Sequence, residues 1–92
     1  MHENQNSIDE NEPTIGEKIE SVKHGIKQIS IGIYDLTIAA QAAKAVGNSE
    51  AIPNIQKGIE MQMKTLDFYR SKLVGLEKAR VEKEVVKNKD NA

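Results

Sequence analysis

Three polar side chains near the start of the chain have the types and spacing that could bind a metal ion. Glu17, Glu20 and His24 follow one another at intervals of three and four residues, so a helix would place them on one face. Two carboxylates and an imidazole are possible ligands for a divalent metal. A solvent-facing polar surface with an ordinary i,i+4 pair between Glu20 and His24 is the simpler interpretation, and we favour it. The sequence therefore predicts no metal and no cofactor.

Nucleophilic catalysis has few candidate residues here. The histidines are His2 and His24, and a serine–histidine–aspartate triad needs one of them in a pocket. His2 lies in a polar N-terminal segment, and we expect His24 on the helix face turned away from the core, outside any pocket. The sequence contains no phosphate-binding glycine loop, no HExxH motif and no cysteine. These observations predict a protein that is not an enzyme.

The charge and composition exclude further classes of protein. The 13 basic and 14 acidic residues nearly cancel, whereas general binding to nucleic acid needs an excess of Lys and Arg. The apolar fraction of 38% is low for one compact core in so short a chain. Residues 1–13 are polar and acidic, do not resemble a signal peptide, and are expected to form a disordered tail. We expect a cytoplasmic location and leave non-classical export open.

A heptad pattern predicts a first long helix over residues 14–46. Thr14 and Glu17 match a capping box at its start, and Gly47 with Asn48 suits its end. Between these ends, apolar residues recur at alternating intervals of four and three, which is the spacing of a coiled coil. We expect six of them to form a self-association seam: Ile19, Val22, Ile26, Ile29, Ile33 and Leu36.

A second helix is expected over residues 53–86, after a turn at 47–52. Its share of the seam is Ile55, Ile59, Leu66 and Leu73. Gln62 interrupts this seam, and we expect Met63 to rotate inward and cover the gap. The alternative is that a buried Gln62 fixes the register or the oligomeric state. The heptad pattern fails beyond Leu76, and residues 87–92 are expected to form a second disordered tail.

The apolar residues outside the seam indicate further contacts. Ile31 and Ile38 on the first helix, and Met61 and Phe68 on the second, form a candidate face for a partner protein. Glycines and alanines beside the first seam, rather than charges, would let neighbouring backbones approach closely. The predicted fold is an all-α, coiled-coil-like hairpin of two long helices. We expect the hairpin to dimerise into an antiparallel four-helix bundle.

Two other structures were weighed for the middle of the first helix. Residues 28–43 carry one charge, Asp35, but they are shorter than the roughly 20 residues that span a bilayer. Residues 29–33 alternate like a strand, but the heptad continues on both sides of them. Both alternatives are therefore set aside in favour of a helix, and we do not expect a membrane as a partner.

Three functions fit this sequence. The first is a protein–protein interaction module, such as a small regulator, inhibitor, adaptor or chaperone, whose partners are a second copy and another protein. The second is a structural subunit of a helical assembly or secretion-type filament. The third is a nucleic-acid-associated helical dimer, against which the interspersed acidic residues argue. No motif in the chain links it to a known family.

Overall fold

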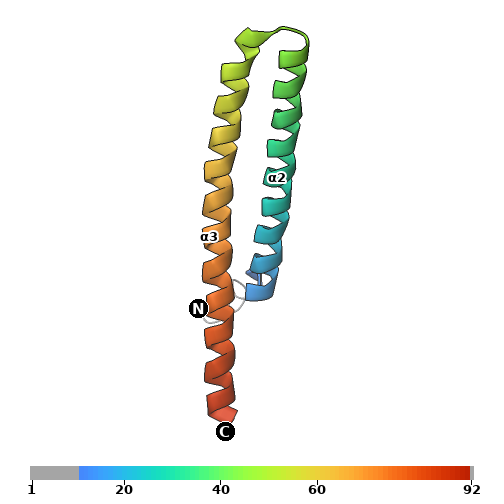
Figure 1. Cartoon of the computed structure of the whole chain (residues 1–92). Coiled ribbons are helices and arrows are strands. Elements are labelled where there is room, and N and C mark those ends of the chain that lie inside the picture. The colour runs from blue at the N-terminus through green and yellow to red at the C-terminus, as the bar shows by residue number, and fades with distance from the viewer. Residues whose placement is uncertain (1–10, 92) are drawn as a thin grey trace.

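The chain folds into a hairpin of two long antiparallel helices (Figure 1). The computed structural model describes residues 11–91, with side chains as far as residue 83. Helix α2 comprises Ile15–Ala45, a short 3-10 helix η1 comprises Ser49–Ala51, and helix α3 comprises Ile52–Asn91. This stretch contains no strand. The expected all-α hairpin is confirmed, while its dimerisation stays a prediction.

The beginning of α2 is fixed by the capping box that the sequence predicts. The backbone N–H of Glu17 donates to the Thr14 hydroxyl at 3.1 Å, and the backbone N–H of Thr14 donates to the Glu17 carboxylate at 2.8 Å. These bonds satisfy two N–H groups that the first turn of a helix would leave without an acceptor. The Glu17 carboxylate also lies near the positive end of the helix dipole.

The end of α2 is a Schellman motif built around Gly47. Asn48 N–H donates to the carbonyl of Ala43 at 2.8 Å, and Gly47 N–H donates to that of Lys44 at 3.2 Å. Gly47 has a φ of 78°, a backbone conformation that glycine adopts without steric cost. This turn reverses the chain, and η1 then leads directly into α3.

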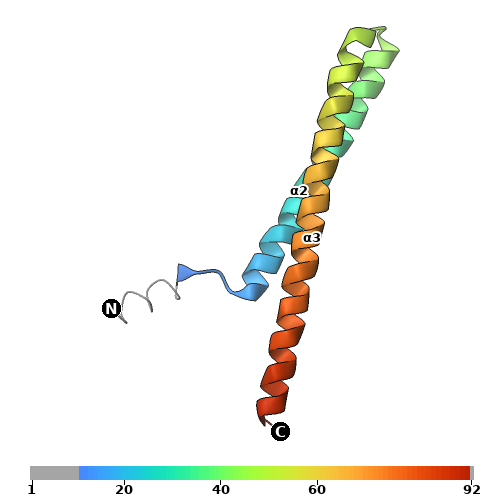
Figure 2. The same ribbon diagram turned by 90° about the vertical axis from the view of Figure 1, so that its left-hand side faces the viewer.

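The two helices run side by side from the turn to the beginning of α2 (Figures 1 and 2). All ten predicted seam residues are buried or half-buried, and Ile19 is fully buried. Only Ile19, Ala43 and Leu66 are buried enough to count as core among the described side chains. A two-helix hairpin therefore covers its apolar stripe only partly, because each helix touches one neighbour.

The prediction for Gln62 and Met63 was wrong in one respect. Gln62 is half-buried in the seam, but Met63 points outward and remains 52% exposed. No buried side-chain oxygen or nitrogen in the described region lacks a hydrogen-bond partner. Gln62 has no described hydrogen bond, so its side-chain amide keeps contact with water. Because the amide is hydrated, Met63 does not have to cover the gap at Gln62. Its role in fixing the register stays a prediction.

Helix α3 runs past its expected end. The expected second helix stops at residue 86, whereas α3 continues to Asn91. After Gly75 the sequence has neither glycine nor proline, so no residue with a strong helix-breaking tendency stops it. Residues 1–10 of the expected acidic tail, and residue 92 of the C-terminal tail, lie outside the described residues.

In the described part of the chain, no helix is both long enough and apolar enough to cross a bilayer.

Candidate interaction face of the hairpin

The ten residues predicted as a self-association seam are buried or half-buried within a single chain, and their contact with a second copy stays a prediction. They lie on the faces that α2 and α3 turn toward each other, which leaves two broad sides of the hairpin open. Leu36 of α2 lies at the level of Gly58 of α3, and Gly25 lies at the level of Tyr69. These two contacts fix the register between the helices. They also show which residues of α2 and α3 stand side by side on each open side.

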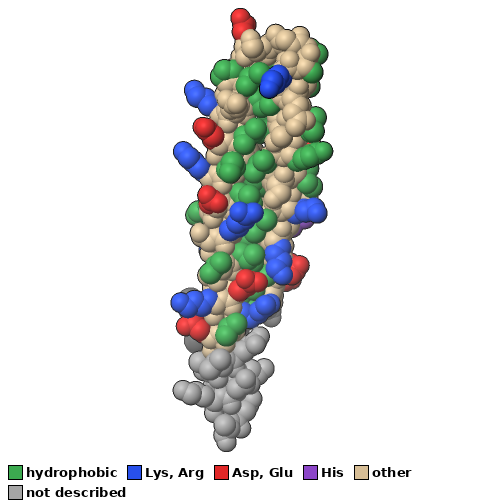
Figure 3. Space-filling model, viewed as in Figure 1, with side chains coloured by type: hydrophobic (Ala, Val, Ile, Leu, Met, Phe, Trp, Pro, Cys, Tyr) green, Lys and Arg blue, Asp and Glu red, His purple; other side chains and the backbone are tan. Residues whose placement is uncertain are grey.

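One open side of the hairpin is charged. In a heptad labelled a to g, with the seam at a and d, this side carries the e and b positions of both helices. Figure 3 shows it, with basic and acidic side chains on both sides of the apolar line between the helices. We call this side the charged face; its charged residues include Lys23, Lys27, Lys44, Glu60, Asp67, Arg70 and Glu77.

The opposite side carries the g and c positions and has a different composition. From Gly25 on α2 to Val46 at its C-cap, and from Asn54 to Phe68 on α3, Asp35 is the one charged residue among the described g and c positions. Most of the others are small or apolar. We call this side the small-residue face, and define it by Gly25, Gly32, Ala39, Ala42, Gly58, Met61, Thr65 and Phe68.

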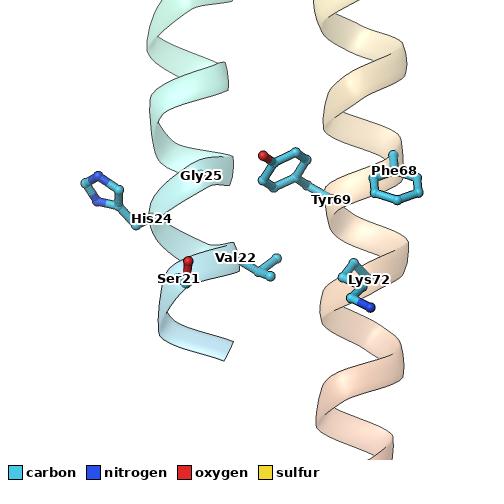
Figure 4. A pocket seen from close by; sticks show the side chains of 7 residues that line it. All are labelled: Ser21, Val22, His24, Gly25, Phe68, Tyr69 and Lys72. Atoms are coloured by element: carbon cyan, nitrogen blue, oxygen red, sulfur yellow. The ribbon is translucent and has the colours of Figure 1, made fainter. Parts of the chain in front are cut away.

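A groove of about 430 Å³ lies at the end of the small-residue face that is farther from the turn. Figure 4 looks at this side, and in it the Tyr69 ring reaches from α3 toward the backbone of α2 at Gly25. Phe68 stands beside it, with the two ring centroids 6.4 Å apart and the ring planes at 73°. This is an edge-to-face arrangement that aromatic pairs favour. The lining is completed by Ser21, Val22, His24 and Lys72.

The glycine at position 25 is required by its contact with Tyr69. A Cβ atom placed there would overlap Cε2 of the ring and stand 2.9 Å from Cδ2. The glycine therefore lets the aromatic ring lie against the helix backbone, and this close approach offsets the cost of a glycine inside a helix.

We expect Gly25→Ala to destabilise the hairpin even though alanine is the better helix former. Displacing the Tyr69 ring from the seam should cost about 1–3 kcal/mol, more than the ~1 kcal/mol that alanine gains in helix propensity. The measurement is the urea midpoint of unfolding at matched protein concentration. Gly75→Ala is the control, because nothing lies within 4 Å of its added Cβ, and it should stabilise. A Gly25→Ala midpoint as high as that of Gly75→Ala would contradict the contact.

The remaining glycines of the small-residue face differ in what they contact. A Cβ at Gly58 would meet a methyl group of Leu36 at 3.4 Å, so this glycine also lies against the opposite helix. A Cβ at Gly32 would have no neighbour within 4 Å. Gly32 therefore leaves a hollow in the middle of α2 that the hairpin itself does not use.

The three candidate metal ligands, Glu17, Glu20 and His24, are exposed to solvent and do not share a contact. Glu17 is engaged in the capping box, and Glu20 pairs with Lys23 at 3.8 Å rather than with His24. In the part of the chain that can be searched, no three His, Asp or Glu side chains lie close enough together to hold a metal ion. The expected Glu20–His24 pair is therefore replaced by an exposed pair that contributes little to stability.

The position of His24 also requires a correction. We expected it outside any pocket, but it lies at the rim of the groove beside Gly25 (Figure 4). It is exposed, and its side chain extends away from the Tyr69 ring. No acidic side chain lines this groove with it, whereas Glu17 and Glu20 lie along a second, more open groove that His24 also lines.

The four residues of the candidate partner face belong to two separate stripes. Ile31 and Ile38 occupy f positions on the outer edge of α2 and are 43% and 42% exposed. Met61 and Phe68 occupy c positions on the small-residue face of α3, and each is 69% exposed. The hairpin thus presents two apolar stripes rather than one continuous patch.

Only part of the groove could be predicted from the sequence. Gly25 beside the seam pointed to a close packing contact, but the partner of that contact depends on the register between the helices. Tyr69 lies at the next position of the seam spacing after Leu66, which indicates a packed residue but not its contact. No motif in the sequence singles out Ser21 or Lys72. Only the register set by the turn brings these residues to the same end of the hairpin.

Comparison of the chain with protein-family models, curated proteins and solved structures gives no match. The function is therefore argued from the residues of the chain itself.

Proposed function

We propose that this protein is a non-enzymatic helical interaction module that acts by self-association, as an antiparallel dimer of hairpins that forms a four-helix bundle. A small regulator, inhibitor, adaptor or chaperone could be built in this way. The free stripe on the outer edge of α2 would then be available to a different protein.

The observation that carries the proposal is the number of large apolar side chains that the single hairpin leaves in solvent. Nine of them are exposed in the described region, whereas three hydrophobic residues are buried. Exposed apolar side chains of this number are typical of a surface that contacts another chain. Obligate homodimers typically bury about 2000 Å² or more between their two chains.

The test is the absolute mass of the chain in solution over a dilution series, by light scattering after size exclusion, with helicity followed by circular dichroism. The expected result is a helical dimer that dissociates on dilution and loses helicity as it does so. The helicity should fall because a hairpin with three buried residues has little core of its own.

Other outcomes would replace this proposal. A helical monomer at every concentration would mean that the exposed stripes are reserved for a different protein. Growth in mass without a limit would indicate a filament subunit. A contact between two different faces of the chain leaves one of each face free, so further copies can always be added. Retention on heparin or DNA that falls with salt would indicate nucleic-acid binding.

A further inference from the structure

We propose that the second copy of the chain docks on the small-residue face, with α3 of each copy lying against α2 of the other. This inference rests on the proposed self-association and adds to it the face and the arrangement. The charged face then remains in solvent on the outside of the dimer.

The two open sides of the hairpin differ in what they can bury. A helix that packs in a bundle extends its apolar stripe from a and d to either e or g. On α2 the e positions are Lys23, Ser30, Thr37 and Lys44, whereas the g positions from the groove to the turn are Gly25, Gly32, Ala39 and Val46. Burying the e positions would desolvate two lysines, and burying the g positions would desolvate none. The charge distribution therefore selects the small-residue face.

Gly32 has no close neighbour on the opposite helix within the described hairpin. Gly25 and Gly58 each lie against a side chain of the opposite helix, but the space above Gly32 is empty. Glycine inside a helix is about 1 kcal/mol less favourable than alanine. Its place at the centre of an apolar face is explained if another helix approaches the backbone there.

The small-residue face is complementary to itself. The contacts that fix the register place Phe68 of α3 close to the level of Gly25, and Met61 close to the level of Gly32. Met61 and Phe68 are seven residues apart in the sequence, and so are Gly25 and Gly32. A two-fold axis along the hairpin would lay α3 of one copy on α2 of the other. The protruding Met61 would then stand over the open space at Gly32 of the second copy, and Phe68 would lie at the groove beside Gly25.

This symmetry is what argues for a second copy as the occupant. An isologous contact needs protrusions and hollows on the same patch, at matching levels, and this face has both. Every neighbouring helix pair in the resulting bundle would be antiparallel, as in bundles with short connections. Met61 and Phe68, each 69% exposed in the single hairpin, supply apolar surface that such a contact would bury.

The test compares Gly32→Glu with Ser30→Glu. Both positions are on α2 two residues apart, but Ser30 is an exposed e position on the charged side. Glutamate fits the hairpin at either site, since nothing lies within 4 Å of a Cβ at Gly32. We expect Gly32→Glu to raise the dimer dissociation constant by about 100-fold or more, because each of the two copies would bury one carboxylate in the contact. Ser30→Glu should change it by less than about threefold.

A second measurement does not depend on disrupting the dimer. The chain has no cysteine, so Gly32→Cys and Ser30→Cys each introduce a single thiol. The alkylation rate of the thiol at position 32 should fall at least about tenfold on going from dilute monomer to concentrated dimer. The thiol at position 30 should react at the same rate in both.

The results separate the two proposals. A parent chain that stays monomeric contradicts the proposed self-association. A parent dimer that survives Gly32→Glu, or that leaves the thiol at position 32 fully reactive, keeps self-association and overturns the docking face. A dimer that is instead broken by Ser30→Glu places the contact on the charged side.

Discussion

An Ile33→Asp variant is expected to lose most of its helical circular dichroism at concentrations where the parent chain is folded. Ile33 lies in the middle of the seam and is half-buried against α3. The substitution removes an apolar side chain worth about 1.5–3 kcal/mol of burial and places a carboxylate among aliphatic groups, which costs more. A hairpin with so small a core has little stability to lose.

Ile31→Asp is the matched control for this variant. It makes the same chemical change two residues away, at a position that is 43% exposed on the outer edge of α2. We expect its helicity and urea midpoint to stay close to those of the parent chain. If the two variants were equally folded or equally unfolded, the assignment of Ile33 to the seam would be wrong.

The second large effect is expected for association rather than folding. Replacing both Met61 and Phe68 by serine should weaken the dimer by at least about 100-fold, because burying such side chains contributes about 1.5–3 kcal/mol each. Each is 69% exposed in the single hairpin, so the hairpin itself should lose little. The dissociation constant from a dilution series of light-scattering masses, with helicity at high concentration, measures both effects.

Val74→Ser with Val81→Ser is the control pair for that experiment. These valines are also exposed, by 64% and 56%, but they occupy b positions on the charged side of α3. Their replacement removes apolar surface of the same kind without touching the small-residue face. Equal weakening of the dimer by both pairs would show that general hydrophobicity, and not this face, drives association. Loss of binding to a different protein with the dimer intact would assign Met61 and Phe68 to a partner site instead.

The parts of the fold that depend on local sequence could be predicted. The capping box at Thr14 and the turn at Gly47 depend on residues a few positions apart, and each was visible in the sequence. The seam followed from periodicity alone, because a spacing of four and three residues can bury only one stripe of a helix. Leu66 and Ile19 are buried where this rule places them.

The parts that depend on pairing between the helices could not be predicted. The contact of Tyr69 with Gly25 requires the register that the turn sets, and many registers are compatible with two heptad seams. The inward rotation assigned to Met63 was wrong because Gln62 could stay in the seam without losing water. The two stripes at Ile38 and Phe68 look equivalent in the sequence and separate only once the sides of the hairpin are distinguished.

The unequal lengths of the two helices have a consequence for local stability. Helix α3 has 40 residues and α2 has 31, and the last turns of α3 extend beyond the beginning of α2 (Figure 1). Backbone amides there are held only by an isolated helix, which forms and melts in about a microsecond, so they should exchange with deuterium almost unprotected. Protection should rise toward Leu66, where both helices pack together. The last turns of α3 would therefore open before the packed part of the hairpin, so a protease would trim this end of α3 before it reached the small-residue face.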